Sequence, residues 1–532
     1  MPVHEQSTAG LIRCLNPSMA NHEKSLTERS LRAVKWNYLG TIGRALAQFV
    51  SLIVLARLLG PEPNGLFSYA LLLISFVGLA TEMGLNSALV QAANLSRAQL
   101  GSAVSRLLLV ALIACGLIYV LAEWIATSLF NTPQATPVLQ AIAPSLIVSA
   151  LSIPPAAMLR RELQFRALTF IGLGSYIFGY IFVGIGVALA GGGVWSLVAA
   201  WYAQNLTACI AMNLVARGSL AWGNPLRLQK LGSFGGIIMV TWLINWVIDN
   251  ATHFVIGRTF GPASLGAFTV ANNLVRTPAS HLVTNLQTVL FPASARAQDN
   301  PVALRRAYLT ALSGVGFVAI PLFGGAAAAS SLVVDALLGA KWTLAQPLFA
   351  PLALAMIAHS LMAIAGPMLG GKGEPLSELK VQALTAVLLV GVLYAASTQG
   401  LETLAWALCG VFFARFAGMT FALARRIDVS PGDVAIALRG GAVLASAAIL
   451  AVFGCDYAFT AAPVTLAPSS KLALVMFAIT VSCAFVLLAF PRVCLDAHLG
   501  WMAARLIGGR ALIHKLPFTH RFMAHIASRS PG

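Results

Sequence analysis

Charged residues are scarce in this chain of 532 residues. Asp, Glu, Lys and Arg together make up 10% of it, and only 17 residues are acidic, whereas an ordinary soluble domain carries about 25% charged residues. Apolar residues reach 58%, and the mean hydropathy is +0.82. This composition excludes an ordinary soluble protein and predicts an all-α polytopic membrane protein.

Cysteine and the common catalytic motifs are also sparse. The seven cysteines lie mostly inside apolar runs, without a Cys-x-x-Cys pair or spaced His partners. They are therefore interpreted as packing residues, with neither a zinc site nor a disulfide framework. The chain lacks a Walker loop, a Gly-x-Ser-x-Gly elbow, a His-Glu-x-x-His pair and a Gly-x-Gly-x-x-Gly turn. We expect a transporter that is not an enzyme and that has no cofactor or metal.

The sequence contains fourteen apolar runs long enough to cross a bilayer as helices, which requires about 20 residues each. The predicted spans are 37–59, 65–89, 105–129, 138–158, 168–190, 194–216, 234–256, 265–291, 307–330, 344–369, 379–398, 402–423, 438–458 and 471–491. The loops between them are short, so no soluble catalytic domain is expected on either side.

Basic residues give the orientation of these spans. The net charge of +17 comes from Lys and Arg scattered singly between apolar runs, so it does not indicate a nucleic-acid surface. With a cytoplasmic N-terminus, the outer loops hold only Arg57, Arg258, Lys341 and Lys471. This bias predicts that both termini are cytoplasmic.

Two stretches about six spans apart indicate an internal duplication. Residues 57–70 and 258–271 share Arg, Gly, Pro, Gly, Phe and Ala at a constant offset and without a gap. Residues 194–197 and 405–408 add a weaker match. Gly-Pro also recurs in tight turns generally, but two matches at corresponding places favour a repeat. The prediction is two parallel-repeat six-helix lobes plus two extra helices.

The predicted organisation has five parts. They are a cytoplasmic N-terminal tail with an interfacial helix (1–36), an N-lobe (37–230), a C-lobe (231–426), the two extra helices (427–491) and a basic cytoplasmic C-terminal tail (492–532).

Three arginines fall within predicted spans and away from the span ends: Arg44, Arg276 and Arg415. Ionisable groups at membrane depth are costly and usually face a cavity or a partner. One interpretation is that each pairs internally, Arg44 with Glu82. The other is a cationic cavity between the lobes that binds a diphosphate, because guanidinium geometry suits phosphate.

Polar and aromatic residues share faces of the seventh and eighth predicted helices. The repeat offset also places Asn245 on Arg44 and Asp249 on Gln48. Amides and aromatic rings suit sugar binding, although hydrogen bonding between helices is the plainer alternative. The substrate-binding candidates are Arg44, Gln48, Trp242, Asn245, Trp246, Asn272, Asn273, Arg276 and Arg415.

Acids in the spans could bind a coupling ion. Asp249 with His253, or Glu82, are the candidates for coupling transport to a proton or sodium gradient. His359 stands alone and is expected to be a buried, hydrogen-bonded residue rather than a ligand.

Five segments of the chain carry a family pattern: 53–62, 82–91, 159–166, 290–293 and 370–373. Together they resemble the polysaccharide transporter family, the bacterial lipid-linked oligosaccharide flippases of the MOP superfamily, and the likeness covers most of residues 31–425. The resemblance implies that the protein lies in the bacterial inner membrane.

The resemblance implies translocation of undecaprenyl-diphosphate-linked oligosaccharide repeat units by alternating access. These units feed exopolysaccharide, capsule or O-antigen synthesis. The implied partners are the polyprenyl-diphosphate-linked oligosaccharide, the lipid bilayer, a polysaccharide polymerase and export machinery, with no nucleic acid. The alternatives are an ion-coupled multidrug or metabolite exporter of the same superfamily, which favours acidic cavity residues, and a membrane glycan polymerase or ligase, which needs a long outer loop.

Overall fold

The computed structural model describes residues 40, 43–82, 96–225, 236–461, 466–496 and 499, and these residues contain helices and turns but no β-strand. Nine helical segments within them are long and apolar enough to cross a membrane. These nine coincide with the third to fifth and the ninth to fourteenth predicted spans. The all-α membrane fold is therefore confirmed, while the total of fourteen spans stays a prediction.

Contacts divide the chain into two compact units. As far as they are described, residues 1–55, 73–123 and 136–233 form the first unit, and residues 56–72, 124–135 and 234–532 form the second. This division follows packing rather than chain order. The lobe and tail boundaries expected from the sequence stay a prediction.

The first unit is built around α10, which packs against α6, α7, α8, η3 and α9. Gly179 allows η3 to approach α10 closely, because a Cβ there would lie 2.7 Å from the main-chain oxygen of Ala200. A further helix covers 43–59, of which residues 43–55 belong to this unit, and Ser51 Oγ on it lies 2.6 Å from the hydroxyl of Tyr176. The other elements are α5 (Arg97–Trp124), α6 (Thr136–Ile142), α7 (Ser145–Arg161), α8 (Phe165–Tyr176), η3 (Ile177–Gly184), α9 (Ile185–Leu189) and α10 (Val194–Val215).

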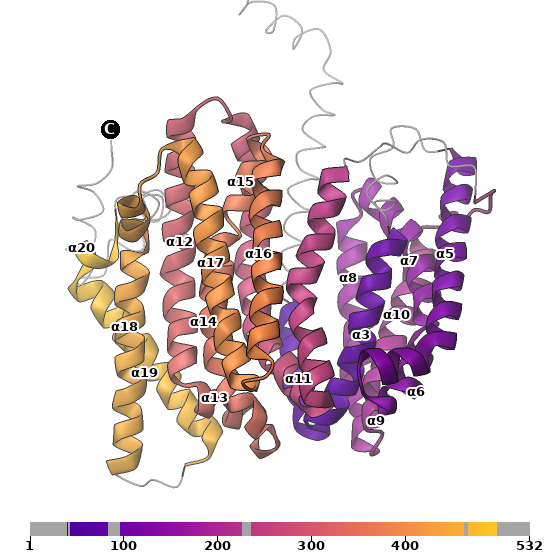
Figure 1. The fold of residues 1–532 in the computed structure, drawn as a ribbon, viewed down its shortest axis with the longest axis horizontal. Helices are drawn as coiled ribbons and strands as arrows, with labels where there is room; N and C mark the ends of the chain where they lie inside the picture. The colour runs from indigo at the N-terminus through magenta and orange to yellow at the C-terminus, as the bar shows by residue number, and fades with distance from the viewer. Residues whose placement is uncertain are drawn as a thin grey trace, which may run out of the picture. The chain divides into compact units, whose positions relative to one another are not determined.

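The second unit contains the remaining helices. Figure 1 shows α12, α14, α16 and α17 side by side within it. Its elements are α3 (Pro61–Glu82, of which residues 61–72 belong here), η1 (Ile125–Leu129), η2 (Pro133–Ala135), α11 (Gly236–Arg296), α12 (Pro301–Ala328), α13 (Ser330–Leu337), η4 (Ala340–Ala345), α14 (Gln346–Met362), α15 (Ala365–Gly371), α16 (Pro375–Ala396), α17 (Leu401–Ile427), α18 (Pro431–Ala461), α19 (Pro468–Ala489) and α20 (Pro491–Cys494).

Helix α14 is the centre of the second unit. It packs against α11, α12, α13, α17 and η4, and 83% of the most apolar window of 340–371 is buried. In contrast, only 6% of the corresponding window of α19 is buried. Large apolar side chains on the outer helices, such as Tyr394 (84% exposed) and Phe477 (69% exposed), form the surface that hydrocarbon covers.

The repeated turns break their helices at equivalent glycines. Gly60 has φ +82° and Gly261 has φ +81°, a left-handed conformation that favours glycine. A proline follows each one at the start of the next helical segment, where its missing N–H is harmless. Residues 236–260 and 262–296 of α11 are therefore two helical halves, which explains how one long helix contains the seventh and eighth predicted spans.

The two turns also pack against each other. A Cβ on Gly65 would lie 1.7 Å from the main-chain oxygen of Pro262, and a Cβ on Gly266 would lie 1.8 Å from that of Pro61. In each repeat, therefore, a glycine packs directly against the main chain of the proline in the other repeat. This reciprocity supports the internal duplication.

Candidate functional site

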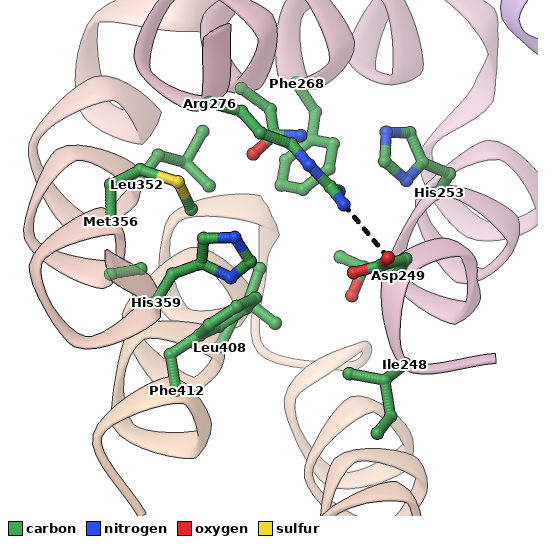
Figure 2. Close-up of a pocket in the computed structure, with 13 residues that line it drawn as sticks. Ile248, Asp249, His253, Phe268, Arg276, Leu352, Met356, His359, Leu408 and Phe412 are labelled. Carbon is green, nitrogen blue, oxygen red and sulfur yellow. Dashed lines mark ion pairs between the residues drawn. The ribbon is translucent and has the colours of Figure 1, made fainter. Parts of the chain in front are cut away.

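A small cavity in the second unit is lined by five polar residues of α11. Figure 2 shows Asp249, His253 and Arg276 facing it, with His359 of α14 across from them. Its volume is about 20 Å³, which is room for about one water molecule. The lining is completed by Ile248, Thr252, Phe268, Asn272, Leu352, Ala355, Met356, Leu408 and Phe412.

An ion pair crosses this cavity. Arg276 Nη2 lies 2.9 Å from Asp249 Oδ2, and the two side chains are 34% and 33% exposed. The break at Gly261 folds α11 back on itself, so two residues of the same helix can face each other. Because the pair is partly solvated, its net contribution to stability is modest, at most about 1 kcal/mol. An incoming anion can therefore compete with Asp249 for the guanidinium.

Three buried polar atoms lining the cavity have no hydrogen-bond partner among the described residues. They are Thr252 Oγ1, His253 Nδ1 and His359 Nδ1. A buried polar atom without a partner costs about 1–3 kcal/mol, so a water molecule in the cavity is strongly favoured.

His359 differs from the sequence-based expectation. Its Nδ1 has no hydrogen bond within the described chain, and its ring instead meets Phe412 edge-on, with centroids 5.9 Å apart. The expected hydrogen bond is therefore absent at Nδ1 among the described residues, because spacing along one helix does not show which groups of other helices surround a side chain.

Arg415 lies in a second, drier polar network. It is only 5% exposed, its Nε donates to Gln382 Oε1 at 2.8 Å and its Nη2 donates to Asn245 Oδ1 at 2.9 Å. Glu378 interacts electrostatically with the same guanidinium. Sequence reasoning missed Gln382 and Glu378, although their spacing of four residues places them on one face of α16.

Asn245 and Asp249 are one turn apart on α11. Arg415 therefore binds the same face of α11 as Arg276, one turn away. Two arginines therefore bind the polar face expected on the first half of α11. Arg276 comes from the second half of α11 and Arg415 comes from α17. In this arrangement the arginines are held by protein groups, and the nearby acids Asp249 and Glu378 compensate their charge.

The structure places the other candidate residues as follows. Asn272 is 7% exposed and lines the cavity, whereas its neighbour Asn273 is exposed and Trp246 is half-buried outside the cavity lining. Asp249 and His253 line the same cavity, and the side chains of Trp242 and Glu82 lie outside the described residues.

Arg44 and Gln48 belong to the first unit. Arg44 is exposed and its Nη1 lies beside Gly172 of α8. Gln48 is half-buried, and its main-chain oxygen accepts a hydrogen bond from Ser51 Oγ at 3.1 Å.

A separate apolar groove runs between α11 and α12. Its volume is about 1250 Å³, and it forms because α12 packs mainly against α18 and α14, while α11 packs against α14, α15 and α16. Leucines at 282, 286 and 290 form one wall, and small residues including Ala307, Ala311 and Gly314 form the other.

Together these features define a polytopic helical membrane protein with ion pairs inside one helical unit, as transporters have. The fold matches that of Lipid II flippase MurJ in an inward closed conformation, with a TM-score of 0.68 at 13% identity, covering 86% of this chain and 99% of that one. At this identity the match establishes the fold alone.

The sequence comparison gives the family. Residues 54–347 match the family described as "Polysaccharide biosynthesis protein", so the chain belongs to that family. It is 22% identical over 357 residues to Lipopolysaccharide biosynthesis protein WzxC of Escherichia coli (strain K12), covering 66% of this chain and 71% of that protein. It is 26% identical over 324 residues to Succinoglycan biosynthesis transport protein ExoT of Rhizobium meliloti (strain 1021), covering 61% and 65%. The family resemblance is confirmed.

Proposed function

We propose that this protein is a flippase that moves undecaprenyl-diphosphate-linked oligosaccharide repeat units from the cytoplasmic to the outer leaflet of the bacterial inner membrane. The observation that carries the proposal is membership of the polysaccharide biosynthesis family over residues 54–347, on a fold shared with a lipid flippase. A polysaccharide polymerase and export machinery are the partners that would use the delivered units.

The physical task explains why such a protein is needed. A sugar headgroup cannot cross hydrocarbon unaided, because each unpaired hydroxyl costs about 2–7 kcal/mol. The apolar groove between α11 and α12 adds to the hydrocarbon-compatible surface along which a polyprenyl tail can remain in lipid.

Arg276 is the residue that we propose for binding the diphosphate. Its guanidinium is 34% exposed, and among the described residues it pairs with the Asp249 carboxylate at 2.9 Å, so a phosphate can replace that carboxylate with similar geometry. The cavity has room for about one water molecule in this structure, so the proposal requires it to widen when the diphosphate binds.

The replacement of Asp249 by a diphosphate at Arg276 also provides a way to couple transport to a proton or sodium gradient. When a diphosphate takes Arg276, the Asp249 carboxylate loses its counter-charge in a partly buried place. A carboxylate in that situation binds a proton or a cation. We propose Asp249 as the coupling acid, with His253 beside it.

The test of the proposed function is a deletion strain. We expect lipid-linked oligosaccharide to accumulate on the inner leaflet while surface polysaccharide is lost, and a plasmid copy of the gene to reverse both changes. Extraction of the lipid fraction, enzymatic release of the glycan and mass spectrometry would measure the accumulation and identify the cargo. A deletion strain with normal lipid-linked intermediates and normal polysaccharide would contradict the proposal.

The proposed topology is tested separately by cysteine labelling. In a background without native cysteines, Thr136→Cys should react with a membrane-impermeant maleimide added to intact cells, whereas Arg161→Cys should react only after permeabilisation. The two positions lie at opposite ends of the segment 136–161, which α6 and α7 cover. The opposite labelling pattern would reverse the orientation of the protein.

A further inference from the structure

Arg57 binds the end of a short helix from the second half of the chain. Its Nε donates to the main-chain oxygen of Leu337 at 2.7 Å, and its Nη2 donates to that of Ala336. These oxygens belong to the last turn of α13. The last carbonyls of a helix have no intrahelical partner and carry partial negative charge, so a guanidinium is well matched to them.

Arg258, the equivalent residue of the second repeat, makes the mirror contact. Its Nη1 donates to the main-chain oxygens of Ser128 and Leu129 at 2.7 and 2.6 Å. These oxygens end η1, which lies in the first half of the chain. Each repeat's arginine therefore holds a helix end of the other repeat.

The residues immediately before the two arginines repeat the pattern. The main-chain oxygen of Ala56 accepts a hydrogen bond from Trp342 Nε1 at 3.1 Å, and the equivalent oxygen of Gly257 accepts one from the Tyr69 hydroxyl at 2.8 Å. Trp342 and Tyr69 are both fully buried. Again each donor comes from the repeat that does not contain the acceptor.

We propose that Arg57 and Arg258 form a pseudo-symmetric latch that holds together the two Arg-x-x-Gly-Pro turns and closes this end of the protein. The turns cannot separate unless both arginine contacts break. Both arginines are exposed, so water can replace the carbonyl oxygens at little cost when the latch opens. The buried glycine and proline contacts beneath them supply the close packing.

The functional consequence rests on the proposed function. In the predicted topology the latch lies at the outer end, which must open for a headgroup to leave. Each latch arginine stabilises the closed state, and its removal should shift the closed–open equilibrium about five-fold toward open, since hydrogen bonds from an exposed charged group contribute modestly. The double variant should multiply the two shifts, because the contacts lie on separate segments.

Opening of the latch can be measured as the labelling rate of a cysteine, without any substrate. Ser68 is 8% exposed, and its Oγ donates to the main-chain oxygen of Asn64 one turn earlier, so Ser68→Cys is a conservative reporter beside the turn. In a cysteine-free background, labelling of this cysteine by an impermeant maleimide should rise about five-fold in Arg57→Gln and in Arg258→Gln, and further in the double variant.

Two controls make the result specific. Lys471→Gln removes a basic residue that the topology also places outside but that contacts the Phe459 ring instead, and it should not change labelling. Arg57→Lys retains the charge and loses the forked geometry, so it should give an intermediate rate and serves as the second variant if Arg57→Gln is not recovered folded.

The outcomes separate the latch from the proposed function. Unchanged Ser68→Cys labelling in the folded double variant would overturn the latch whatever the protein transports. Increased labelling in the double variant, together with normal lipid-linked intermediates in the deletion strain, would uphold the latch and contradict the flippase function.

Discussion

Gly65→Ala is expected to leave little or no folded protein in the membrane. The new Cβ would lie 1.7 Å from the main-chain oxygen of Pro262, far inside van der Waals contact. Both groups belong to backbone packed at the repeated turns, so neither can move aside as a flexible side chain could. We expect destabilisation of about 4 kcal/mol or more, a value reached only by severe packing errors. Gly266→Ala should behave alike, since its Cβ would lie 1.8 Å from the oxygen of Pro61.

The measurement is protein level and thermal unfolding in detergent. Gly116→Ala in α5 is the matched control, because a Cβ there meets nothing within 4 Å and alanine favours a helix by about 1 kcal/mol over glycine. If Gly65→Ala and Gly116→Ala were equally abundant and equally stable, the close packing of the two turns would be refuted.

Arg276→Ala should nearly abolish transport while protein level stays normal. The ion pair that it removes is partly solvated, so little stability is lost. A forked arginine–diphosphate interaction, in contrast, contributes charge-assisted hydrogen bonds of about 1.5–3 kcal/mol each. Its loss should slow translocation about 100-fold or more. Surface polysaccharide in the complemented deletion strain, with membrane protein quantified in parallel, is the readout.

Two comparisons sharpen this prediction. Arg305→Ala removes another partly exposed ion pair, with Asp433 at 2.8 Å, and should retain transport. Arg415→Ala should instead lower the protein level, because Arg415 is 5% exposed and its loss would strand Gln382 and Asn245 in the interior. Normal polysaccharide from Arg276→Ala cells would remove the diphosphate site from the proposal.

The polar face of α11 shows which features of the site could be predicted from residue spacing. Periodicity placed Asn245, Asp249 and His253 on one face. In the structure Asp249 and His253 line the same cavity, while Asn245 accepts a hydrogen bond from Arg415. Periodicity could not reveal that Arg276 of the same helix would fold back to pair with Asp249. That pairing depends on the break at Gly261.

The sequence identified Gly-Pro in the two turns, and their left-handed glycines follow from that pattern. The contact between the two turns could not be predicted in this way, because a match at a constant offset shows that two segments are similar in sequence and does not show that they touch. Arg57 and Arg258 were placed in outer loops by charge counting alone. Their carbonyl partners, which lie far away in the sequence, were unpredictable from it.

The sequence by itself determined that this is an all-α membrane protein of the polysaccharide biosynthesis family, and it predicts an internal duplication. Hydrophobic run length, charge bias and repeated turns are local properties that any part of the chain displays without its partners. The tertiary structure alone showed that Arg415 is buried in a network, that Arg276 lies in a partly solvated ion pair, and that Arg57 and Arg258 each bind main-chain oxygens far away in the sequence. Those roles depend on carbonyl and carboxylate groups brought close only by packing, because a charge inside a membrane protein is defined by its neighbours in space.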